Sequence, residues 1–220
     1  MSIKGFNQSA PNFVNKFVRA ASGDSTGLDA VTPPPPGPTP AGITATGGII
    51  SDFVDPADGV AYRAHIFRSL DSFAVTDVSG PGLVDFLVVA GGGGGGGGEN
   101  GGGGGGGAGG YRTSMPEGPG GPSPSAESQV TVSTGTYTVT IGAGGQAGGR
   151  GVLSGLSGSA SNIAFPSAIP STGGGGGAYH PNDGAKPGGS GGGGNRPTAD
   201  GASGTANQGF NGGDGQPYTN

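Results

Sequence analysis

Alternating hydrophobic and polar positions predict β-strands in the middle of the chain. Around residues 60–67, one face of the pattern is apolar (Val60, Tyr62, Ala64 and Ile66), as a half-buried strand requires. Short apolar runs at 49–54 and 73–78 predict two further strands. Residues 83–90 are apolar at every position except Asp85, which predicts a central strand covered on both faces.

A second stretch of alternation lies downstream and predicts a hairpin over residues 128–141. Val130 and Val132 alternate with polar residues, Thr134-Gly135 forms a turn, and the alternation resumes at Tyr137. Five or six short strands are enough for a small β-sandwich-like domain. We therefore predict a mostly β fold.

A different periodicity marks the N-terminal arm, residues 1–32. Five apolar side chains recur at helical spacing and predict a short helix with a partner-docking face: Phe6, Phe13, Val14, Phe17 and Val18. A lone helix of this length is marginal in water, so the face needs a partner. A proline-rich spacer, 33–40, separates the arm from the strands. The arm is interpreted as an anchor on a larger assembly; the alternative is a helix folded back on its own β domain.

Glycine changes the picture after residue 90. The chain has 220 residues and 57 glycines, of which only ten precede residue 91. Residues 91–98 and 101–107 are uninterrupted glycine runs. One interpretation is a flexible linker, since glycine loses the most entropy on ordering. The other is a packed bundle of polyglycine II helices, with three residues per turn and no Cβ to keep neighbours apart. We predict the bundle, inserted into the β domain.

Four regions follow from these patterns. They are the anchoring arm 1–32, the spacer 33–40, a β domain 41–90 that includes the hairpin 128–141, and a polyglycine II region 91–220.

Composition and charge exclude most enzymatic and nucleic-acid functions. The chain has no cysteine and two histidines, so we expect no cofactor and no metal site. No lysine is followed by Ser or Thr, which excludes a P-loop, and the nucleophile-elbow match at 188–192 is expected by chance in so glycine-rich a chain. We expect no catalytic residue. The formal net charge of −5 disfavours nucleic acid, and no apolar run is long enough for membrane insertion or a classical signal peptide.

The order of these elements resembles the glycine-rich domain of tailed-bacteriophage virion proteins, especially tail-fibre and adhesin proteins. The likeness covers roughly residues 60–215 and rests on an apolar strand, two glycine runs, Gly110-Tyr111-Arg112, the predicted hairpin and Ile141-Gly142-Ala143-Gly144-Gly145. It implies a non-enzymatic virion protein, made in the host cytoplasm, that helps attach the particle to the host surface. A homo-oligomer such as a trimer is expected. The alternative is a decoration or connector protein of the head or baseplate; a cellular glycine-rich structural protein is a third reading.

The resemblance also implies which residues touch the receptor. Glycine helices offer no side-chain chemistry, so recognition falls to islands of varied side chains between them. The candidates for contact with a host glycan or outer-membrane protein are Tyr111, Arg112, Tyr179, His180, Asn182, Asp183 and Arg196. The alternative is that these islands only turn the chain, because they are rich in Pro, Asp and Gly. Other virion proteins are the expected partners of the arm, and the natural chain is expected to continue past Asn220.

Overall fold

A computed structural model of the chain describes residues 42–55, 59–98, 102–115, 126–149, 154–179, 184–195 and 200–216. The chain divides into two compact units, whose described parts are 52–55 with 59–62, and 42–51 with 63–216. The predicted helix and spacer lie outside the described residues, so both stay predictions. The described residues are mostly β and contain no helix, and the mostly β prediction is confirmed.

The smaller unit holds the turn between two paired strands, β2 (Ile49–Val54) and β3 (Ala61–Ile66). Two backbone hydrogen bonds hold the turn: Asp55 N–H donates to Val60 O at 2.9 Å, and Gly59 N–H donates to Asp55 O at 2.8 Å. Gly59 has φ +73°, which glycine adopts without strain. Phe53 and Tyr62 stack with ring centroids 5.5 Å apart. These contacts hold the adjoining ends of β2 and β3 together.

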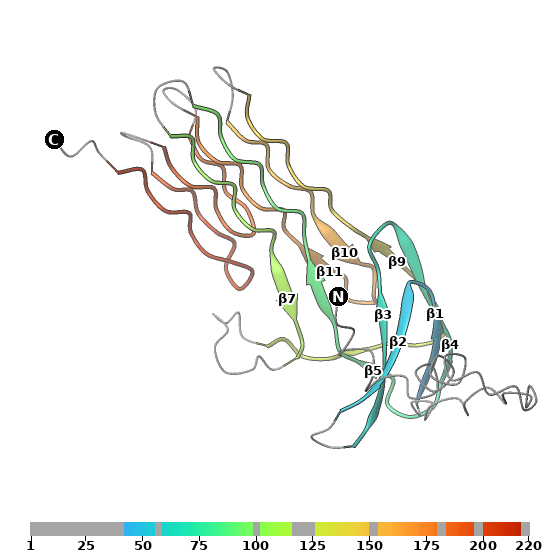
Figure 1. Cartoon of the computed structure of the whole chain (residues 1–220). Coiled ribbons are helices and arrows are strands. Elements are labelled where there is room, and N and C mark those ends of the chain that lie inside the picture. Colours follow the sequence, from blue (N-terminus) through green and yellow to red (C-terminus); the bar gives the residue numbers. More distant parts are fainter. Residues whose placement is uncertain are drawn as a thin grey trace, which may run out of the picture. The chain divides into compact units, whose positions relative to one another are not determined.

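The larger unit is built on a five-stranded antiparallel sheet (Figure 1). Its strands, in spatial order, are β1 (Ile43–Thr46), β4 (Asp71–Val78), β9 (Gly135–Thr140), β10 (Ser161–Ile163) and β11 (Ile169–Ser171). Two short antiparallel ribbons complete it: β5 (Leu83–Val84) with β8 (Val130–Thr131), and β6 (Leu87–Val89) with β7 (Tyr111–Thr113).

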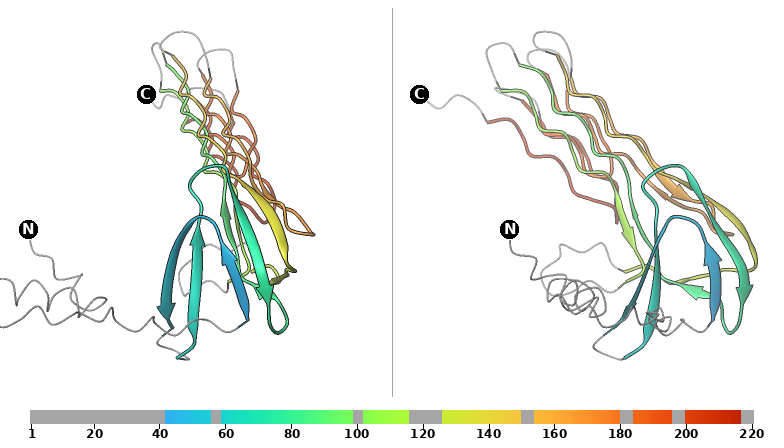
Figure 2. Two further views of the ribbon diagram at one scale, coloured as in Figure 1. Left: turned by 90° about the vertical axis from the view of Figure 1, so that its right-hand side faces the viewer. Right: turned by 45° about the vertical axis from the view of Figure 1, so that its right-hand side comes forward.

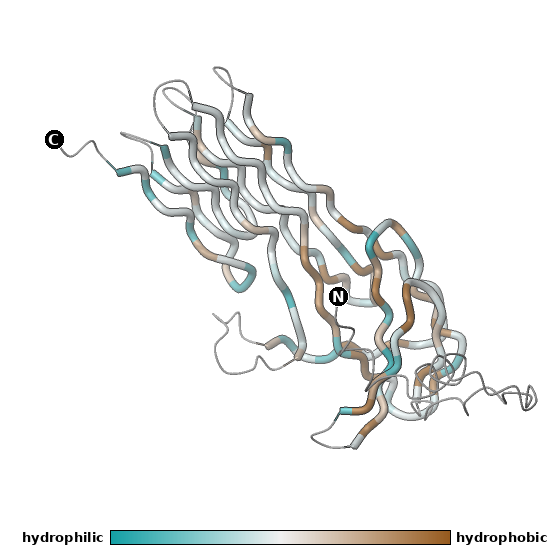
Figure 3. Tube along the Cα trace, viewed as in Figure 1, coloured by the Kyte–Doolittle hydropathy of each residue, from teal (hydrophilic) through white to brown (hydrophobic). Residues whose placement is uncertain are grey.

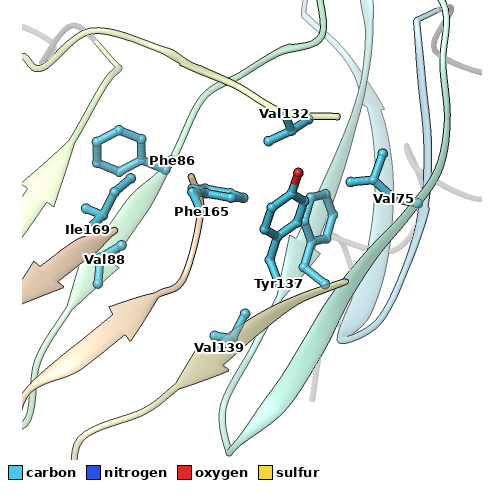
Figure 4. Packing of buried hydrophobic residues seen from close by; sticks show 10 residues of the cluster. Val75, Phe86, Val88, Val132, Tyr137, Val139, Phe165 and Ile169 are labelled. Carbon is cyan, nitrogen blue, oxygen red and sulfur yellow. The ribbon is translucent and has the colours of Figure 1, made fainter. Parts of the chain in front are cut away.

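The hydrophobic core lies among these strands, and its centre is aromatic (Figure 4). Phe73 of β4 and Tyr137 of β9 lie opposite one another in the register, and both rings contact Phe165 from the β10–β11 turn. The Tyr137 hydroxyl donates to Ser133 O at 2.9 Å and accepts from Ser133 N–H at 3.1 Å, so its polar atom is satisfied inside the core. The aliphatic members of the cluster are Ala45, Val75, Val88, Val132, Val139 and Ile169.

The apolar stretch 83–90 differs from the prediction. It forms two short strands, β5 and β6, and only one of its faces is covered. Phe86 and Val88 are buried, whereas Leu83, Leu87 and Val89 are 45%, 48% and 51% exposed. An apolar run marks a fully buried strand only when layers cover both of its faces, and here the core covers one.

The predicted hairpin 128–141 also differs in its pairing. Both strands exist, but within the described residues they do not pair with one another: β8 pairs with β5, and β9 pairs with β4 and β10. The prediction of strands from the alternation is confirmed, whereas the prediction that these two neighbouring strands pair with each other is wrong.

Beyond the strands, the glycine-rich segments run side by side as extended, wavy ribbons (Figures 1 and 2). We call them the glycine segments: residues 91–98, 102–110, 142–149, 154–160, 172–178, 184–195 and 200–216. Most of them continue directly from a strand; β6, for example, leads into 91–98, and 102–110 leads into β7. In Figure 3 they are pale along most of their length, while the strongly hydrophobic residues concentrate on the strands.

Backbone hydrogen bonds between the glycine segments repeat every three residues. From the first segment, N–H groups donate to its neighbour 102–110 in the pairs Ala90–Gly110, Gly93–Gly107 and Gly96–Gly104, at 3.0, 2.8 and 2.8 Å. The next residues along, Gly91 and Gly94, donate instead to Ser159 and Leu156. The third set, Gly92 and Gly95, accepts from Gly145 and Gly148 at 2.8 and 2.7 Å. Each segment is thus bonded to several neighbours in different directions.

Glycine is required in these segments because neighbouring backbones approach closely, not because of an unusual φ. Among the described glycines of these segments, none has φ in the left-handed region. A Cβ built on Gly94 would fall far inside van der Waals contact with the backbone of Gln146, and one on Gly174 would do the same with Gly107. In 142–149 the same conflict arises at Gly142 and Gly145, three residues apart, while Ala143 stands between them and Gln146 follows them. Side chains therefore appear only where the neighbouring backbone leaves room.

Candidate binding surfaces

At one end of the glycine bundle, hydrogen bonds join residues near the ends of several segments. Gly148 N–H donates to Gly95 O, Gly155 N–H to Gly177 O, and Gly194 N–H to Gly213 O, each within 3 Å. These bonded residues stand next to the connections 99–101, 150–153, 180–183 and 196–199. The described segment ends on both sides of these connections therefore lie together, at the end away from the strands.

Four candidate contact residues belong to two of these connections. His180, Asn182 and Asp183 fall in 180–183, and Arg196 falls in 196–199, all outside the described residues. Tyr179, directly before the first connection, is 8% exposed and so offers little surface to a receptor. The five apolar residues proposed for docking through the arm also lie outside the described residues: Phe6, Phe13, Val14, Phe17 and Val18.

The remaining two candidates, Tyr111 and Arg112, lie in β7 at the opposite end of the bundle, where glycine segment becomes strand. Successive side chains of a strand point to opposite faces, so these two neighbours do not form one surface. Arg112 lies opposite buried Val88 in the register, whereas Tyr111 lies opposite exposed Val89.

Arg112 makes a network of hydrogen bonds. Its Nε–H donates to Glu127 Oε1 at 2.7 Å, its Nη2 pairs with Glu127 Oε2, and its Nη1 donates to Pro170 O at 2.9 Å. The hydrogen bond to the Glu127 carboxylate raises the pKa of Arg112 above its ordinary value, so the guanidinium keeps its charge. The side chains of Arg112 and Glu127 are 20% and 31% exposed. The pair is thus anchored on one side and reachable from solvent on the other.

Two open hollows flank this ion pair. The first, about 380 Å³, runs between residues 127–131 and 166–169. The second, about 490 Å³, is lined by Arg112, Ala126, Glu127, Ala206, Asn207 and Gln208. Sequence reasoning found Arg112 but not Glu127, Asn207 or Gln208. These residues come from distant parts of the chain, and no spacing in a single sequence signals their approach.

The described residues hold no group of three or more His, Asp or Glu side chains placed to bind a metal ion. In the same part of the chain, no helix is both long and apolar enough to span a membrane.

Comparison with known proteins gives one match. The family model of the glycine-rich domain matches residues 68–219, which include β4 and every glycine segment. No curated protein matches, and no solved structure matches. The matched region covers well over half of the chain, together with the strands that carry the bundle. The chain therefore belongs to the glycine-rich domain family.

Proposed function

We propose that this protein is a non-enzymatic structural component of a tailed-phage particle, and that it acts as a tail-fibre or adhesin protein in attachment to the host surface. The observation that carries the proposal is the hydrogen-bonded glycine bundle, which projects from a β base and brings several segment ends together away from the strands. A rigid support that brings segment ends together suits the presentation of a contact surface.

In this proposal the glycine segments are polyglycine II helices, and the strands form a β-sandwich-like base. The three-residue repeat of the hydrogen bonds supports the helices, since polyproline II geometry has three residues per turn. The continuation of β6 and β7 into bonded glycine segments supports a role for the base in setting the register.

The proposed receptor contacts are His180, Asn182, Asp183 and Arg196, in the connections 180–183 and 196–199. Imidazole, amide and carboxylate groups hydrogen-bond hydroxyl and peptide groups of a host glycan or outer-membrane protein. The proposed anchor is the N-terminal arm, which would bind another virion protein through its apolar face.

Adsorption of mutant particles tests this function. Replacing His180, Asn182 and Asp183 together by Ala should lower adsorption to host cells at least tenfold, while particle assembly stays normal. Tyr179 is left unchanged, because a buried ring would confound binding with folding. Thr138→Ala, an exposed position in β9, is the control and should adsorb normally.

The same particles separate the adhesin from its alternative. Labelling the protein on intact particles should place it at the distal part of the tail or fibre. Normal adsorption by the triple variant, with the label spread over the head or confined to the baseplate, would contradict the adhesin and favour a decoration or connector protein.

A further inference from the structure

The second hollow beside Arg112 is walled by polar groups that the fold already holds in place. Arg112 has five N–H donors, and its bonds to Glu127 and Pro170 engage three of them. One hydrogen on Nη1 and one on Nη2 remain. The Glu127 oxygens each keep acceptor capacity beyond the bond to Arg112. The ion pair therefore presents donors and acceptors side by side.

Gln208 is fixed in the same wall by two backbone contacts. Its carbonyl accepts from Tyr111 N–H at 3.0 Å, and its side-chain Oε1 accepts from Thr172 N–H at 2.8 Å. Because Oε1 is held in this way, the Gln208 amide nitrogen keeps its two donors in a defined position.

Asn207 completes the wall. It is exposed and has φ +59°, the only left-handed φ of a non-glycine residue among those described. Asn tolerates this conformation better than most residues. Its amide adds a further donor and acceptor at the rim of the hollow.

Charge and size narrow the class of ligand. Glu127 neutralises Arg112, and the chain carries a net charge of −5, so an anion gains little here. A volume of about 490 Å³ lies within the usual range for small-molecule sites. Paired donors and acceptors at fixed positions match the adjacent hydroxyl groups of a sugar. We propose that this hollow binds a neutral saccharide unit.

The biological role of this site rests on the proposed adhesin function. The site itself lies at the strand end of the bundle. Its test uses the purified full chain, so it does not depend on adsorption. ¹⁵N-edited NMR would follow the Arg112 Nε–H and the Asn207 and Gln208 amide signals during titration with the methyl glycosides of glucose, galactose, mannose and N-acetylglucosamine. At least one sugar should shift all three sets of signals saturably.

Asn207→Gly is the matched variant, because glycine accepts the left-handed φ while the amide is lost. Loss of its hydrogen bonds should weaken sugar binding roughly two- to tenfold, the effect of one such bond. Gln146→Ala, an exposed residue of the segment 142–149, should bind like the unmodified chain. The proposal is overturned if none of the four sugars shifts these signals, or if Asn207→Gly binds as tightly as the unmodified protein.

The two proposals fail separately. If the purified chain binds a sugar in this hollow while the triple variant of His180, Asn182 and Asp183 adsorbs normally, the proposed receptor contacts are wrong and the sugar site stands. If the triple variant adsorbs poorly while the purified chain binds none of the sugars, the adhesin function stands and the sugar site is wrong.

Discussion

Neighbouring glycines of one run meet different surroundings. A Cβ on Gly94 would collide with the backbone of Gln146 and Ala147, whereas a Cβ on Gly95 would meet only Gly104 O at an ordinary contact distance of 3.6 Å. Composition alone shows eight identical residues. The packing divides them into positions that must be glycine and positions where a methyl group fits.

Alanine substitution at these two neighbours should therefore have opposite effects. Gly94→Ala should lower the free energy of unfolding by about 1–3 kcal/mol, because the rigid neighbouring backbone cannot make room for the methyl group. Gly95→Ala should leave it unchanged or raise it by about 0.4–1 kcal/mol, because Ala restricts the unfolded chain. Thermal and denaturant unfolding of both variants check this. Equal stability of the two would contradict the packed bundle and favour a linker.

The sequence carries part of this distinction. In 142–149 and 154–160 the glycines that packing requires stand three residues apart, with Ala, Leu or Ser among the residues between them, so the sequence shows the period directly. In 91–98 every position is glycine, and no pattern separates Gly94 from Gly95. The contacts of Arg112 with Glu127 were also beyond reach, because a single sequence does not show which distant segments meet.

Among the strands, a visible local pattern decided what could be predicted. The sequence predicts β3 and β9 from their alternation and β4 from a short apolar run, whereas β10 and β11 have three residues each and are not predicted. Three residues give no alternation to detect, and Pro170 within β11 argues against a strand on local grounds. Both strands are specified by their neighbours in the sheet.

Buried serines hydrogen-bond the backbone where strands continue into glycine segments. Ser161, at the start of β10, accepts from Gly142 N–H at 2.9 Å, and Ser171, at the end of β11, donates to Gly110 O at 2.6 Å. Both side chains are almost completely buried. They satisfy backbone groups at the point where the regular strand ladder ends.

Removing either hydroxyl should destabilise this junction. Ser171→Ala removes one of the two hydrogen bonds to the Gly110 carbonyl, which also accepts from Ala90 N–H, and should lower the free energy of unfolding by about 0.5–1.5 kcal/mol. Ser157→Ala, at an exposed position of a glycine segment, is the control and should change it by less than about 0.5 kcal/mol. Urea unfolding measures both. A Ser171→Ala variant as stable as the control would contradict this role.

At the scale of the whole molecule, the proposed anchor predicts that the N-terminal arm is needed for incorporation into particles but not for folding. Deleting residues 1–32 should leave the β base and the glycine bundle folded, because the strands and segments described here bond to one another without it. The same deletion should remove the protein from purified particles, as immunoblotting of the particles would show. A truncated protein still present in particles at normal levels would place the anchor elsewhere in the chain.

The dominance of backbone hydrogen bonds in the glycine bundle has a consequence for how the protein responds to temperature. Unfolding a bundle with few buried apolar side chains exposes mainly peptide groups, and polar exposure lowers the heat capacity where apolar exposure raises it. Calorimetry should therefore give a heat-capacity increment well below about 12–15 cal/mol/K per residue. A normal increment would contradict this account. With a small heat-capacity increment, the enthalpy of unfolding changes little with temperature. Cooling should therefore destabilise the bundle less than it destabilises a hydrophobic core.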